Sequence, residues 1–199
     1  SILLHAKTYD YASMLAARGV KVVDIAFAGG LAREGHIVKA LALGAPFTKL
    51  ICMGRGAMIP GFVGSNIEGV LNPERKVKVN GNWDELPPAV KELGLTAEEI
   101  FAGYYDVQKK IGEDEMKNVP YGAIAMWTLV DKLAAGLQQL MAGARRFRLP
   151  EISRSDIFSA NRETEIETNI PFITDVLDES AKRILISESK IAVRKAANR

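Results

Sequence analysis

The sequence has only one cysteine, Cys52, and two histidines in 199 residues. A single cysteine excludes an intramolecular disulfide and any metal or cluster site made of cysteines alone within this chain. There is also no uninterrupted apolar run long enough to cross a bilayer, and no signal peptide is recognisable. We therefore expect a soluble cytoplasmic protein with no membrane partner and no metal site of its own.

The sequence has almost no excess of charge, with 26 basic and 24 acidic residues and a net charge of +2. Proteins that bind nucleic acid through electrostatics carry a larger basic excess. Arg145, Arg146 and Arg148 do cluster, but they follow the expected end of a helix. Basic side chains there satisfy the last carbonyl groups and the helix dipole. We expect no nucleic-acid partner.

The most informative stretch is residues 22–58, which is typical of strand, glycine turn, helix, strand and glycine turn. Residues 22–28 and 50–53 are short apolar segments that favour strands. Between them the apolar residues recur at helical spacing up to Gly44, an expected helix end. Two consecutive strands joined by such a helix must be parallel, so the stretch predicts a βαβ unit.

Both glycine turns follow the carboxyl ends of their strands, so we expect them on one rim of the sheet, where α/β proteins place ligands. Gly29 and Gly30 form the first turn, and Gly54 and Arg55 lie in the second. Backbone N–H groups without obstructing side chains, together with a fixed guanidinium, suit a phosphate. Arg33 is a further candidate, or else a solvent-facing helix start.

The same stretch resembles the last two strands of FMN-dependent (β/α)8 barrels. The match consists of GG-x-x-R, then VKALALGA, then GR. In that family the turns that correspond to residues 28–30 and 54–56 hold the flavin phosphate. Residues 59–67 and 129–149 extend the likeness, more narrowly, to the FMN-binding, glutamate synthase-like family.

The resemblance implies an α/β fold, the C-terminal part of a (β/α)8 barrel with its last two strands in residues 1–72. Residues 73–199 would form a loop excursion and a mainly helical extension. A complete barrel needs roughly 250 residues and about 200 at the least. Because the likeness begins near residue 1, we expect a C-terminal part, a processed piece or one subunit of a split enzyme, completed by the remaining barrel or a partner subunit in an oligomer.

The resemblance also implies an activity, the reductive amination of 2-oxoglutarate to glutamate by an FMN-dependent oxidoreductase. This chain would supply the flavin-phosphate clamp through Gly29, Gly30, Arg33, Gly54 and Arg55. Its catalytic residues are unknown, since they would lie on the strands that this chain does not contain.

Two features depart from the family pattern. Many such barrels place an aspartate before the paired glycines, where it binds the ribityl chain, but this sequence has Ala28. Glutamate synthases carry a cysteine cluster after the last strand, and residues 60–72 contain no cysteine. An iron–sulfur cluster is therefore expected only on another segment or subunit. Cys52 is expected to be buried in its strand.

Three alternatives remain open. A related flavin barrel could act on another amino acid, such as an N-methylated one, or on a 2-hydroxy acid. The chain could instead be a non-catalytic subunit that completes a partner's barrel. A third possibility is a phosphate-binding barrel with a different ligand, since the glycine turns do not by themselves specify flavin.

The rest of the sequence predicts mostly helices. We expect helices at residues 2–18, 96–111, 120–141 and 174–197, a broken helix at 57–71 and a surface loop at 72–88 with a short strand around Val77 and Val79. Capping signatures precede two segments, at 96–99 and 153–156. The predicted core residues of the first helix are Leu4, Tyr11, Met14 and Leu15, and His5 is expected to be an ordinary packed or surface residue. The predicted core residues of the helix at 120–141 are Ile124, Trp127, Val130, Leu133, Leu137 and Leu140.

Overall fold

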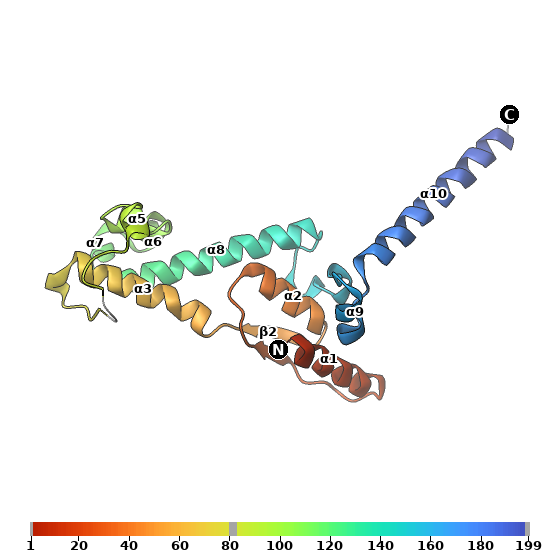
Figure 1. Cartoon of the computed structure of the whole chain (residues 1–199), viewed down its shortest axis with the longest axis horizontal. Coiled ribbons are helices and arrows are strands. Elements are labelled where there is room, and N and C mark those ends of the chain that lie inside the picture. The colour runs from red at the N-terminus through yellow and green to blue at the C-terminus, as the bar shows by residue number, and fades with distance from the viewer. Residues whose placement is uncertain (1, 80–82, 198–199) are drawn as a thin grey trace. The chain divides into compact units, whose positions relative to one another are not determined.

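The computed structural model describes residues 2–79 and 83–197, with side chains up to residue 187. It is an α/β structure of mostly helices with one small parallel sheet (Figure 1). Its contacts divide the chain into two compact units. Unit 1 comprises residues 1–25, 39–50 and 148–199, and unit 2 comprises residues 26–38 and 51–147.

The predicted βαβ unit is confirmed as β1 (Ile25–Ala28), α2 (Glu34–Gly44) and β2 (Thr48–Cys52). The two strands pair in parallel as a two-stranded sheet. The first strand is shorter than predicted, since only Ile25–Ala28 pair with β2 and residues 22–24 are irregular. The predicted burial of Cys52 is wrong, since its side chain is exposed at the end of β2.

The helix predicted at the start of unit 1 is confirmed as α1 (Ile2–Ala17), but its predicted core face is wrong. The large side chains are exposed, and the buried ones are small or polar. Two buried alanines allow close packing, and the buried His5 is hydrogen-bonded through Nε2 to the carbonyl oxygen of Ala40 at 2.9 Å. The exposed residues are Leu4, Tyr11, Met14 and Leu15. The buried ones are His5, Ala6 and Ala12.

The C-terminal part of unit 1 contains η2 (Leu149–Glu151), η3 (Arg154–Asp156), α9 (Arg162–Thr168) and α10 (Ile173–Ala197). The predicted capping signature of Ser153 and Asp156 is confirmed as a capping box on η3. The predicted terminal helix is confirmed as α10.

Arg154 connects three segments of unit 1. It donates to the carbonyl oxygens of Leu43 at 2.6 Å and Thr168 at 2.7 Å, which close the ends of α2 and α9. Its guanidinium also lies 3.9 Å from the ring centroid of Tyr9. Burial lowers the pKa of Arg154, because a charged group loses hydration there. The apolar core beside it is small and consists of Ala6, Leu43 and Ile170, with Ile157 packed against them.

Unit 2 is built on α3 (Arg55–Leu71) and α8 (Tyr121–Gly143), which pack side by side (Figure 1). The prediction of a broken helix at 57–71 is wrong, since α3 is continuous through Pro60. Its glycines are sites of close approach instead. A Cβ on Gly64 would lie 2.6 Å from the carbonyl oxygen of Tyr121 and 2.9 Å from Gly122 backbone atoms.

A buried carboxylate fixes this helix pair. Glu68 of α3 accepts from the backbone N–H of Tyr121 at 2.9 Å, at the start of α8, and from Arg75 at 2.7 Å. Arg75 ends η1 (Pro73–Arg75), and its hydrogen bond to Glu68 raises the pKa of the guanidinium. Burying an acid is tolerated here because both partners compensate it.

The stretch predicted as a surface loop is irregular after η1, and the short strand expected at Val77 and Val79 is not formed. These residues lie against α3, where a Cβ on Gly69 would meet both of them. Asn80, Gly81 and Asn82, which the sequence places in a turn, lie outside the described residues.

Four short helices follow, α4 (Pro88–Lys91), α5 (Ala97–Ile100), α6 (Tyr104–Ile111) and α7 (Glu113–Met116). The capping box of Thr96 and Glu99 is confirmed. The single helix predicted there is split, because Phe101 turns into the core and Gly103 donates to the Thr128 hydroxyl at 3.2 Å. The buried core of unit 2 consists of Ile67, Leu86, Ala97, Phe101, Met116, Ile124 and Ala125.

The predicted helix at 120–141 is confirmed as α8, and Ile124 is buried as expected. Val130 and Leu140, also predicted to be buried, are exposed. None of the helices in the described residues combines the length and hydropathy needed to cross a membrane.

Candidate functional site

The first glycine turn follows β1 directly, in unit 2. Gly29 has φ 134° and Gly30 has φ 69°, conformations that residues with a side chain rarely adopt. A Cβ on Gly30 would meet no atom within 4 Å. Packing therefore leaves the space beside Gly30 open, and its backbone can be approached closely.

The second turn caps α3. Gly54 is the N-cap residue, and its carbonyl oxygen accepts from the amides of Ala57 at 3.0 Å and Met58 at 3.2 Å. No side chain caps this end, and the amides of Arg55 and Gly56 have no acceptor within the helix. The position of a Cβ on Gly54 is also open to 4 Å. The N-terminus of α3 thus presents backbone donors, with a positive dipole end, to an open space.

The structure brings the two turns together. A Cβ on Gly56 would lie 3.0 Å from the carbonyl oxygen of Leu31 and 3.2 Å from the Cβ of Ala32. The first turn of α3 therefore packs on the segment directly after Gly30. We call the residues Gly29, Gly30, Gly54, Arg55 and Gly56 the glycine rim.

The two arginines predicted for this site lie at the N-termini of two helices. Arg33 precedes α2, and its carbonyl oxygen accepts from the amides of His36 at 3.0 Å and Ile37 at 3.2 Å. Arg55 is the first residue of α3. Both side chains are exposed, and within the part of the chain that the structure describes neither forms an ion pair. Their charges remain available to an anion.

Two residues of α2 near the rim are absent from the sequence prediction. Nδ1 of His36 accepts from the backbone N–H of Ala32 at 3.3 Å, which fixes the segment between the turns. Glu34 packs toward α8, where a Cβ on Gly136 would lie 2.7 Å from its Cγ. A signal for His36 exists in the sequence, because a histidine six residues after Gly30 lies near the start of the predicted helix, where its ring can accept from a free backbone N–H group. The position of Glu34 depends on α8 and has no local signal.

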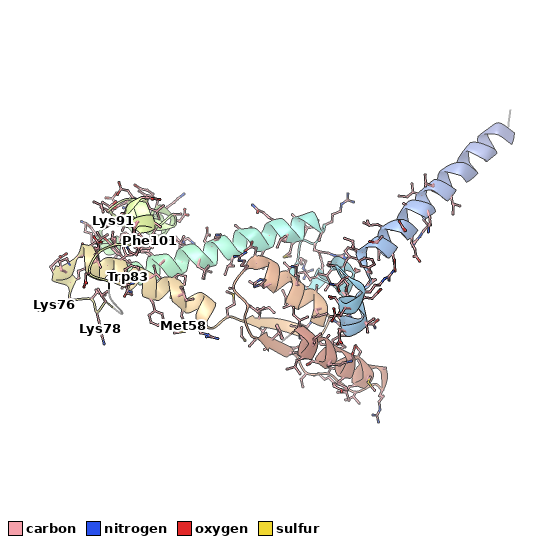
Figure 2. The ribbon with its side chains drawn as sticks, viewed as in Figure 1. Met58, Lys76, Lys78, Trp83, Lys91 and Phe101 are labelled. Atoms are coloured by element: carbon pink, nitrogen blue, oxygen red, sulfur yellow. The ribbon has the colours of Figure 1, made fainter. Side chains whose placement is uncertain are left out.

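The basic residues after α3 belong to a different place. Figure 2 labels Met58 in the first turn of α3, and Lys76 and Lys78 on the loop beyond its other end. A helix of 17 residues is about 25 Å long. At that distance exposed charges are screened at physiological salt, so these lysines add little field at the glycine rim.

Other ligand chemistry has less support in this chain. Among the described residues, no group of three or more histidine, cysteine, aspartate and glutamate side chains is placed to hold a metal ion. Ala28, where the resembling barrels have an aspartate, is the last residue of β1 and offers no side-chain hydrogen bond. The site's donors are thus backbone amides and two guanidinium groups, which suit an anion.

Comparisons of the chain with protein-family models, with curated proteins and with solved structures gave no match.

Proposed function

We propose that the glycine rim binds the phosphate of FMN, and that the chain is part of a cytoplasmic FMN-dependent oxidoreductase similar to glutamate synthase. The observation that carries the proposal is the contact between the two turns at Gly56, with open space beside Gly30 and Gly54. Two separate glycine turns would be ordinary. Two that meet on one rim, each with an arginine nearby that forms no ion pair among the described residues, form a compact set of anion donors.

In this proposal each group of the rim has a distinct task. The amides of Arg55 and Gly56 donate to the phosphate oxygens, and the dipole of α3 favours their negative charge. The guanidinium of Arg55 supplies a charge-assisted hydrogen bond, and Arg33 adds a second positive charge at the start of α2. His36 keeps the Ala32 segment in place. FMN, when bound, would supply the hydride and electron chemistry.

The finer fold assignment belongs to the same proposal. The parallel β1–α2–β2 unit is a repeating element of (β/α)8 barrels, and its turns at the carboxyl ends of the strands agree with the position of ligands in that fold. Residues 1–72 would be the last part of such a barrel, with the catalytic residues, a 2-oxoglutarate or glutamate-class substrate site and any iron–sulfur cluster on other segments or subunits.

The experiment compares the affinities of the full chain for FMN and for riboflavin, which lacks the phosphate, by titration of flavin fluorescence. FMN should bind more tightly than riboflavin. Arg55→Ala should weaken FMN binding by about 10- to 100-fold, since a charge-assisted hydrogen bond contributes about 1.5–3 kcal/mol. Riboflavin binding should not change.

Lys76→Ala is the matched control, because it removes one positive charge at the other end of α3. It should leave FMN binding within about twofold of the wild type, because an exposed charge this far away is screened. An equal loss in both variants would indicate general electrostatic attraction and contradict the clamp. If inorganic phosphate displaced FMN and bound as tightly as FMN does, the result would favour the alternative in which the rim binds a different phosphate ligand.

A further inference from the structure

The helix α10 makes side-chain contacts with other elements at its start. Arg162 donates to both carboxylate oxygens of Asp175, at 2.6 and 2.8 Å, and the amide of Phe172 donates to Glu165 at 3.0 Å. Beyond this first turn, no other element of the described chain packs extensively on α10. Isolated helices of this kind are marginal in water, because most helical stability comes from packing an apolar face. The helix therefore needs a partner along its length.

The side chains of α10 form a regular exposed seam. Ile173, Leu177, Ser180, Ile184 and Ser187 alternate at spacings of four and three residues, which is the heptad spacing of a coiled coil. Leu177 is 61% exposed and Ile184 is 58% exposed. From Leu177 to Ser187 these positions alternate between a large and a small residue. We call these five residues the α10 seam.

We propose that the α10 seam binds the same seam of a second copy of this chain, with the two helices antiparallel. The spacing places Ile184 at an a position of the heptad and Ser187 at a d position. In an antiparallel pair each a position faces a d position of the partner, so the large Ile184 meets the partner's small Ser187. A parallel pair would stack serine on serine and leave voids next to crowded layers. Alternating large and small residues across facing positions fills the space between helices better.

The charges along α10 favour the same orientation. Asp175, Asp178 and Glu179 make its start acidic, and Lys182 and Arg183 follow. After Ser187 the sequence contains four basic residues and one acidic residue. An antiparallel pair places the acidic start of each helix beside the basic end of the other. A parallel pair would place like charges together, which costs free energy at an interface.

The first test is the oligomeric state of the full chain, measured by sedimentation equilibrium. We expect a concentration-dependent dimer. Ile184→Asp should weaken self-association by about tenfold or more, because it places a charge in the seam. Leu185→Asp is the matched control. Leu185 is 66% exposed but lies about 100° around the helix from Ile184, so its substitution should leave the dimer intact. A monomeric wild type, or equal effects of the two substitutions, would overturn the proposal.

The second test determines orientation by cross-linking single cysteines in a Cys52→Ser background. With Ile184 opposite the partner's Ser187, the two copies of position 187 lie about 5 Å apart along the axis, and those of position 180 about 16 Å apart. Oxidation should therefore produce a cross-linked dimer of the Ser187→Cys variant on a non-reducing gel, whereas the Ser180→Cys variant should run as a monomer. Cross-linking of both variants would show a parallel pair, and any other pattern would overturn this register. Both readouts are independent of flavin binding, so they stand or fall separately from the proposed function.

Discussion

Each of the two units of this protein is stabilised internally, and the kind of contact differs between them. Unit 2 has an apolar core that extends from Ile67 of α3 to Ala125 of α8, with several side chains from the short helices between them. The buried apolar cluster of unit 1 is small, and polar groups such as His5, Arg154 and Ser159 connect its segments instead. We infer that the close packing of apolar side chains and helices determines stability in unit 2, whereas side-chain hydrogen bonds to backbone carbonyls determine it in unit 1.

The largest effect is expected from Gly64→Ala in unit 2, which should cost about 3 kcal/mol of unfolding free energy. The new Cβ would collide with backbone atoms of Tyr121 and Gly122, which cannot rotate away. Gly61→Ala is the control in the same helix, because its Cβ would meet the flexible thioether of Met126 at 3.2 Å. That variant should be neutral, or more stable by up to about 1 kcal/mol through helix propensity.

Urea unfolding, with hydrogen exchange to follow the amides of α3 and α8, measures both variants. Equal losses in the two would mean that glycine matters in α3 for its backbone alone, and the close approach of α3 and α8 would then not determine the stability of unit 2.

The next effect is expected from Arg154→Gln in unit 1, at about 2 kcal/mol, because carbonyl oxygens at the ends of α2 and α9 lose a charged donor. Arg162→Gln is the matched control. Arg162 is paired with Asp175 on the surface, and exposed ion pairs contribute about 1 kcal/mol or less. Hydrogen exchange of α9 should accelerate much more in the Arg154 variant. Similar rates in the two variants would contradict a central role for Arg154.

The smallest effect is a dependence of unit 1 on pH. Burial lowers the pKa of His5, its hydrogen bond to Ala40 opposes this, and the charge of Arg154 lowers the pKa further. The unfolded chain therefore binds a proton near pH 6.5, where the folded chain does not yet do so. The contribution to stability is complete above about pH 6.5 and is lost as the pH falls from there toward the folded pKa.

His5→Gln keeps a side-chain N–H donor but cannot titrate, so its unfolding free energy should change less between about pH 7 and pH 5 than that of the wild type. Urea unfolding across this pH range gives the comparison. An identical slope in the two proteins would show that the protonation of His5 is not linked to folding.

Local sequence patterns predicted those features that depend on residues close together in the chain. The βαβ unit and both capping boxes are of this kind, since Thr96 and Glu99, or Ser153 and Asp156, find each other within one turn. The glycine turns followed from the same local reasoning. Their contact at Gly56 agrees with the prediction that they share a rim.

The errors have a common cause, because they concern features that distant segments decide. The glycines of α3 suggested a broken helix. Position 64 instead requires a glycine because α8 lies against it and leaves no room for a side chain. In α1 the largest apolar residues were expected inside, but its neighbours in unit 1 accept the smaller His5, Ala6 and Ala12. The burial of Cys52 failed because the described sheet has only two strands.

The central claim, that the glycine rim is an anion site, is tested most directly by an NMR titration of the full chain with FMN and with inorganic phosphate. We expect the amide resonances of Gly30, Arg55 and Gly56 to shift in both titrations, with those of Gly29 and Leu31 beside them. We expect the amides of Lys76 and Lys78 to stay unchanged. Shifts confined to Lys76 and Lys78 or to residues 145–148 would contradict the claim. So would the absence of any shift at the glycine rim at millimolar phosphate.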